Sequence, residues 1–120
     1  MPIKSYRDLH VWQAAVDLVV EVYRLTQQFP KQEVFGLASQ MQRAAVSVPS
    51  NIAEGHGRNS GNEFGRYLSI ALGSLAELET QCIIAEKLQY VGQEKSLTLL
   101  AKTDEIGRML RGLLKSVKRQ

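Results

Sequence analysis

Apolar residues recur every three or four positions along most of the chain, which is the spacing of a helix that buries one face. Residues 9–29 carry two such stripes side by side. The first contains Leu9, Trp12, Val16, Val19 and Tyr23, and the second contains Val11, Ala15, Leu18, Val22, Leu25 and Phe29. Because only a narrow polar strip is left for water, we expect this helix to be covered on two sides, within a bundle or at a subunit contact. Ser5 followed by Asp8 is typical of a capping box that opens the helix, and Pro30 closes it.

Residues 36–55 form a second segment with one apolar face, made of Leu37, Met41, Ala44, Val48 and Ile52. Pro49 lies inside this pattern, where it cannot donate a backbone hydrogen bond and crowds the preceding turn. We therefore expect a helix with a kink near residues 45–49. Three glycines within residues 55–61 predict a turn after it. A phosphate-binding P-loop is not indicated there, because the preceding strand and the lysine of that motif are missing.

The last two helices are predicted at residues 61–91 and 94–118. The third helix has the stripe Phe64, Leu68, Ala71, Leu75, Leu78, Cys82 and Ala85, and the fourth has Leu99, Thr103, Ile106, Leu110, Leu113 and Val117. Such spacing is typical of antiparallel helices that cross at shallow angles. Ser60 with Glu63 predicts a capping box, Gly92 predicts the third helix's end, and Gly73 with Ser74 is expected to admit a neighbouring backbone. The chain is therefore predicted to be all-α: one domain over residues 1–120, an antiparallel up-down four-helix bundle with a kinked second helix.

Composition agrees with a single globular domain. The chain has 120 residues, of which 44% are hydrophobic and 22% are charged. Its one cysteine, Cys82, excludes an internal disulfide and fits a reducing, cytoplasmic compartment best. We expect no association with a membrane, because no apolar run approaches the roughly 20 residues of a membrane span and the first ten residues lack the apolar stretch of a signal peptide.

Positive charge is concentrated at the C-terminal end. The net charge is only +3, but residues 106–120 contain five basic residues and no acidic one: Arg108, Arg111, Lys115, Lys118 and Arg119. The first four share one side of a helix, because they are separated by three, four and three positions. Two interpretations stay open. The cations complement the helix dipole and keep the surface soluble, or they bind an anionic partner such as RNA or DNA.

A polar stripe follows the other side of the second helix and contains Gln40, Arg43, Ser47, Asn51 and Glu54. If the stripe faces water, it has no further meaning. If it is partly buried, each group needs a partner, and Arg43 is then expected to pair with Glu77 or Glu79 on the next helix. That hypothesis describes a structural polar network that fixes the register of the second and third helices. It predicts that Arg43→Ala loses more stability than a surface substitution does.

No constellation of residues predicts catalysis. The two histidines, His10 and His56, have no acid or second histidine at ligand spacing, and no Glu-x-x-His pattern of a di-iron bundle is present. We therefore expect no catalytic residue, no metal site and no cofactor, and we expect that the protein is not an enzyme.

Two runs of residues carry a resemblance to a known family. The run FGLASQMQRAAVSVPSNIAEGHGR at residues 35–58, followed by EFGRYLSIALGSLAELETQ at residues 63–81, resembles the four-helix-bundle proteins associated with intervening sequences of bacterial 23S ribosomal RNA genes. The likeness extends over essentially the whole chain. It departs from the family at Gln42, where arginine is common, and at His56, where an apolar or aromatic residue is common, which weakens the case for a nucleic-acid surface on the second helix.

The resemblance implies a cytosolic bundle that assembles into homo-oligomeric, five-fold rings and has no established enzymatic activity. It also relates the chain to accessory proteins of diversity-generating retroelements, which are basic rings that bind nucleic acid and a reverse transcriptase. The expected function is therefore a non-catalytic, pentameric protein that binds structured RNA or DNA through the basic stripe of its last helix. The alternative is a protein-interaction scaffold with no nucleic-acid role. The surplus apolar surface of residues 9–29 independently favours self-association, although it does not give the number five.

Overall fold

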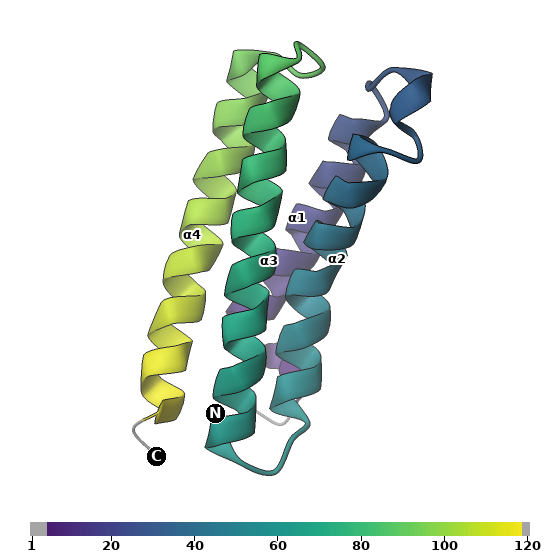
Figure 1. The fold of residues 1–120 in the computed structure, drawn as a ribbon. Helices are drawn as coiled ribbons and strands as arrows, with labels where there is room; N and C mark the ends of the chain where they lie inside the picture. The colour runs from purple at the N-terminus through teal and green to yellow at the C-terminus, as the bar shows by residue number, and fades with distance from the viewer. Residues whose placement is uncertain (1–4, 119–120) are drawn as a thin grey trace.

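A computed structural model describes residues 5–118, and these form four long helices joined by short connections. The elements in chain order are the 3₁₀ helix η1 (Tyr6–Asp8), α1 (His10–Thr26), the 3₁₀ helix η2 (Lys31–Glu33), α2 (Leu37–His56), α3 (Gly61–Lys87) and α4 (Gln93–Lys118). Successive long helices run in opposite directions in a bundle that measures 46 × 24 × 21 Å (Figure 1). The prediction of an all-α, up-down four-helix bundle is confirmed, and the described residues contain no strand.

Each long helix packs against its neighbours in sequence, and α4 returns to α1 to close the bundle. The core is built from the predicted stripes, with Leu18, Met41, Ile52, Leu68, Leu78 and Leu110 almost completely buried. The seam between α1 and α4 is polar at its surface. Lys102 forms an ion pair with Glu21, and the Lys95 ammonium donates a hydrogen bond to Gln28 Oε1 at 3.1 Å.

The two apolar stripes of α1 have different environments. The second stripe faces the core, where Val11, Ala15 and Val22 are buried. The first stripe is only partly covered, because Tyr23 remains 43% exposed and its neighbour Val20 remains 44% exposed. Within one chain the second side of α1 is therefore covered only in part, and the alternative expectation, that a subunit contact covers it, stays a prediction.

The second helix continues through its proline. α2 runs unbroken from Leu37 to His56 with Pro49 buried inside it, so the proline does not divide the helix. The predicted turn starts later than expected, because Gly55 and His56 belong to the helix. Gly55 is buried, and a Cβ atom placed on it would lie 2.5 Å from Tyr67 Cβ. The close approach between α2 and α3 therefore depends on Gly55.

The expectation that Gly73 admits a neighbouring backbone is wrong. Gly73 is exposed, and no atom lies within 4 Å of the Cβ position built on it. Its neighbour Ser74 does face α2, where its hydroxyl oxygen lies 2.7 Å from that of Ser47. The pair of small residues therefore contributes one hydroxyl contact between helices and no backbone contact.

Two helix ends differ from the predicted ones, because local hydrogen bonds determine where each helix begins or ends. The capping box of Ser5 and Asp8 opens the 3₁₀ helix η1, and α1 begins afterwards without a side-chain cap. The third helix, predicted to end at residue 91 before Gly92, ends four residues earlier, at Lys87. Gln89 there has a positive φ of 64°, and the Tyr90 N–H donates to the Ala85 carbonyl at 2.9 Å. This pattern is a Schellman motif with glutamine where glycine is usual.

By length and composition alone, α3 is apolar enough to cross a membrane, with a mean hydropathy of 1.3 over its most apolar 18 residues. This differs from the expectation that no apolar run approaches that length. Of that window, 39% is buried inside the bundle, where α3 packs between α2 and α4. A core helix of a soluble bundle meets the same compositional test.

Candidate nucleic-acid interface

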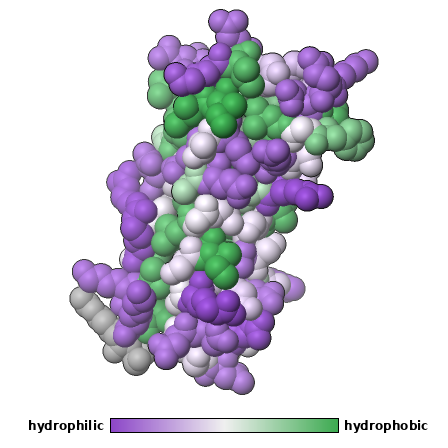
Figure 2. All heavy atoms as spheres, viewed as in Figure 1, coloured by the Kyte–Doolittle hydropathy of each residue, from purple (hydrophilic) through white to green (hydrophobic). Residues whose placement is uncertain are grey.

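Four of the five predicted cations form one continuous exposed face on α4. Arg108, Arg111, Lys115 and Lys118 are all exposed, and none of them makes an ion pair within residues 5–118. Arg119, the fifth, lies outside the described residues. We call these four residues the basic face. In Figure 2, hydrophilic side chains cover the edge of the molecule that α4 forms in Figure 1.

The apolar side of α4 determines where these cations lie. Leu99, Ile106 and Leu110 are buried against the bundle, so residues on the opposite side of the helix must face water. Steps of three, four and three residues then place the cations in one row about 15 Å long, at 1.5 Å per residue. The apolar residues and the cations repeat at the same helical spacing, so they lie on opposite sides of α4.

Acidic residues border the basic face at its N-terminal end. Asp104 and Glu105 are exposed one turn before Arg108. Arg111 reaches toward this border: a Cβ atom on Gly107 would lie 3.3 Å from its guanidinium nitrogen. A cavity of about 190 Å³ beside it is lined by the side chains of Asp104 and Glu79. The negative charge of these residues limits the basic face at its Arg108 end.

Close packing of α3 supports the lower half of the face. A Cβ atom on Gly61 would lie 3.2 Å from the Val117 carbonyl oxygen, and one on Gly65 would lie 3.4 Å from Leu114 Cδ1. The absence of side chains on these two glycines lets the start of α3 approach the end of α4. The last turn of the basic face is therefore anchored by packing on a neighbouring helix.

The polar stripe of α2 forms only part of the expected network. The Ser47 and Ser74 hydroxyls are hydrogen-bonded at 2.7 Å, and the Asn51 amide donates to the Ser47 carbonyl at 2.8 Å and to its hydroxyl at 2.9 Å. These three side chains join α2 to α3. Glu79 belongs to a different contact, because it accepts a hydrogen bond from the Thr103 hydroxyl of α4 at 2.7 Å.

The expected ion pair of Arg43 does not form. Arg43 is exposed and has no ion pair or hydrogen-bonding side chain within the described residues, since its position on α2 faces solvent. Glu77 instead accepts a long hydrogen bond of 3.5 Å from the Gln81 amide. Within one chain, the structure gives no reason for a large stability loss in Arg43→Ala. Gln40 is exposed too, and Glu54 pairs with Arg58 at 3.1 Å on the surface.

Two further polar features were not anticipated from the sequence, an unpartnered buried amide oxygen and a contact between two connections. Gln81 is buried, and its Oε1 has no hydrogen-bond partner within the described residues. Glu33 accepts hydrogen bonds from the Tyr90 hydroxyl at 2.9 Å and the Leu37 N–H at 3.0 Å. Glu33 and Tyr90 are 57 positions apart and belong to different connections, so only the folded topology brings them together.

The described residues contain no group of three histidine, cysteine, aspartate or glutamate side chains that could hold a metal ion. His10 is exposed, and the His56 ring packs edge-on against Phe64 with centroids 5.6 Å apart. Burial raises the pKa of the Cys82 thiol, which lies 3.6 Å from the Ser96 hydroxyl in the core. The thiol is therefore protonated at neutral pH and shielded from reagents.

One comparison identifies a family, and another shows the same fold in a solved structure. The family model described as 23S rRNA-intervening sequence protein matches residues 7–112. A crystal structure of a protein with unknown function from the S23 ribosomal protein family of Bacteroides thetaiotaomicron superposes with a TM-score of 0.79. That protein is 23% identical, and the match covers 88% of this chain and 98% of that one. No curated protein matches the chain.

Proposed function

Because the chain belongs to the 23S rRNA-intervening sequence protein family, we propose that it is a non-catalytic protein that binds structured RNA or DNA through the basic face of α4. The observation that carries this proposal is the row of four exposed cations without ion-pair partners among the described residues. Cations that only complemented the helix dipole would be expected in the last turn. Arg108 and Arg111 extend the row two further turns toward the middle of the helix.

Binding through this face would use phosphates and would discriminate little between sequences. Lysine and arginine side chains on a helix surface meet the backbone of a nucleic acid and displace its counterions. No aromatic side chain lies between Arg108 and Lys118, so stacking on bases contributes little. The affinity should therefore fall steeply as salt concentration rises.

Self-association is the second part of the proposal. Val20, Tyr23 and Val46 are each about two fifths exposed on α1 and α2, and α1 has more apolar surface than one bundle hides. Exposed apolar surface of this kind marks contacts between proteins. A symmetric assembly would repeat the basic face around its axis and would bind a long nucleic acid at several points at once. The expectation of five copies rests on the family resemblance.

Fluorescence anisotropy with a labelled structured RNA at low salt tests the proposal. We expect wild-type protein to bind and the double variant Arg111→Glu/Lys115→Glu to lose at least 30-fold in affinity. The matched control is Arg43→Glu/Lys87→Glu, which changes the net charge equally at two exposed cations outside the basic face. Equal losses in both variants would show that only net charge matters. Absence of wild-type binding would leave the protein-interaction scaffold as the better explanation.

A further inference from the structure

Phe35 is the most exposed large apolar side chain in the described part of the chain. It is 96% exposed and stands in the connection between η2 and α2. Its neighbour Val34 is 55% exposed. The backbone around both residues is held by two fixed contacts, because Glu33 accepts hydrogen bonds from Tyr90 and from the Leu37 N–H. The structure therefore presents an aromatic ring to solvent from a connection that these two hydrogen bonds join to Tyr90 and to the start of α2.

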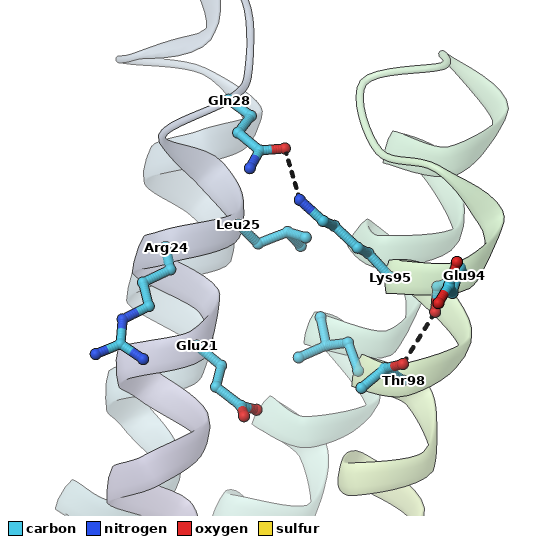
Figure 3. Close-up of a pocket in the computed structure, with 8 residues that line it drawn as sticks. Glu21, Arg24, Leu25, Gln28, Glu94, Lys95 and Thr98 are labelled. Atoms are coloured by element: carbon cyan, nitrogen blue, oxygen red, sulfur yellow. Dashed lines mark hydrogen bonds between the residues drawn. The ribbon is translucent and has the colours of Figure 1, made fainter.

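A cavity of about 450 Å³ opens between α1 and α4 at the same end of the bundle. Figure 3 shows its lining: Leu25 projects into the opening from α1, and Gln28 and Lys95 close one edge through their hydrogen bond. Leu99 is buried in its wall, Glu21 lies at the opposite edge, and Arg24 points away. The apolar part of the cavity is therefore formed by Leu25 and Leu99, and its other lining residues are polar or charged.

We infer that Phe35 of one copy inserts between α1 and α4 of a neighbouring copy, against Leu25 and Leu99. This inference rests on the proposed self-association and names the contact that produces it. The volumes agree, because a cavity of about 150 Å³ already accepts a benzene ring. The larger cavity therefore has room for the phenyl ring and for part of Val34.

The position of the two features on the molecule favours a second copy of this chain. Phe35 lies in the connection before α2, and it does not line the cavity between α1 and α4 at the same end of the bundle. One copy therefore offers the ring while its own cavity stays open for the next copy. Repetition of such a head-to-tail contact closes into a ring when the rotation between copies is suitable.

Sedimentation velocity at a series of micromolar concentrations tests the contact. We expect Phe35→Ala to weaken self-association by about 30-fold or more, as is usual for an aromatic anchor at an interface centre. Leu97→Ala is the matched control. Leu97 is 58% exposed at the same end of the bundle, but it does not line the cavity, so the variant should associate like wild type. Circular dichroism checks that both variants keep their helices.

Cross-linking then identifies the partner surface. A chain carrying both Phe35→Cys and Thr98→Cys should give a ladder of covalent oligomers under mild oxidation, whereas a mixture of the two single variants should stop at dimers. Cys82 is buried and does not interfere. Self-association that is unchanged in Phe35→Ala, or that gives no disulfide ladder, would overturn this contact and leave the proposed assembly in place through another surface. A wild-type protein that stays monomeric would overturn both.

Discussion

The hydroxyl of Tyr90 donates a 2.9 Å hydrogen bond to the carboxylate of Glu33, joining the α1–α2 connection to the α3–α4 connection. The other oxygen of the same carboxylate accepts the backbone N–H of Leu37, in the first turn of α2. The Leu37 N–H and the Tyr90 hydroxyl lower the pKa of Glu33 below its ordinary value of 4.5. The Glu33 carboxylate in turn raises the pKa of Tyr90 above 10.0. One carboxylate therefore fixes the two connections at one end of the bundle.

This contact predicts a loss of stability on both sides of neutral pH. A carboxylate with a lowered pKa contributes stability that is complete above its ordinary pKa and is lost as the pH falls through its folded pKa. A tyrosine with a raised pKa contributes stability that is complete below its ordinary pKa and is lost as the pH rises through its folded pKa. The stability that this pair contributes should therefore decrease at pH values below about 4.5 and above about 10, and we expect the melting temperature to decrease in both ranges.

Thermal melts of wild type, Glu33→Gln and Tyr90→Phe over that pH range separate the two limits. Glu33→Gln keeps an acceptor for the Leu37 N–H but cannot titrate, so its melting temperature should depend less on pH on the acid side. Tyr90→Phe should depend less on pH on the alkaline side. Curves parallel to wild type in both variants would show that other groups cause the pH dependence.

Substitution of Gly55 should be strongly destabilising although it adds only one methyl group. The added Cβ would lie 2.5 Å from Tyr67 Cβ, so α2 and α3 must move apart. We expect Gly55→Ala to lower the free energy of unfolding by about 1–3 kcal/mol, measured by urea denaturation. Gly73→Ala is the control, because nothing lies within 4 Å of its Cβ position and alanine favours helix by about 1 kcal/mol. A destabilised Gly73→Ala would contradict the packing described for α3.

The hydroxyl pair between Ser47 and Ser74 should stabilise the α2–α3 contact cooperatively. The Asn51 amide also bonds to Ser47, so removal of one hydroxyl leaves its partners with fewer hydrogen bonds. We expect a double-mutant cycle of Ser47→Ala and Ser74→Ala to give a coupling free energy of about 0.5–1.5 kcal/mol. Strictly additive effects would mean that the two hydroxyls bond to water as well as to each other.

Replacement of Gln89 by glycine should stabilise the protein. Its φ of 64° is a left-handed conformation, which costs a residue with a side chain roughly 1 kcal/mol and costs glycine little. We expect Gln89→Gly to raise the free energy of unfolding by a few tenths of a kcal/mol to about 1 kcal/mol. Gln93→Gly, at the first position of α4, is a control that should not stabilise the protein. A destabilised Gln89→Gly would argue against the Schellman motif.

The sequence predicts the bundle well because helical periodicity records which residues are buried. The stripes through Leu18, Met41, Leu78 and Leu110 all face the core. It predicts helix ends less well, since capping depends on local geometry: Gln89 takes a conformation that nothing in the pattern requires. A turn was expected at Gly55 because glycine commonly breaks helices, but here a neighbouring side chain requires its small size.

In the candidate site, too, some features could be predicted from the sequence and others could not. Exposure of Arg108 and Lys115 follows from the core stripe of α4, so one helical period is enough to predict it. Partners across helices depend on register, which a single sequence does not supply. Arg43 was therefore expected to pair with Glu77 or Glu79 if its stripe was buried, but it is exposed and makes no ion pair within the described residues, while the bond between Thr103 and Glu79 was missed.

The salt dependence of RNA binding tests the central claim most directly. If the basic face neutralises about four phosphates, a plot of log K against log salt concentration should have a slope of roughly −2.8 to −3.6. The double variant Arg111→Gln/Lys115→Gln should make the slope shallower by about 1.4–1.8, because two phosphate contacts are lost. A wild-type slope near zero, or a slope unchanged in the double variant, would contradict binding through this face.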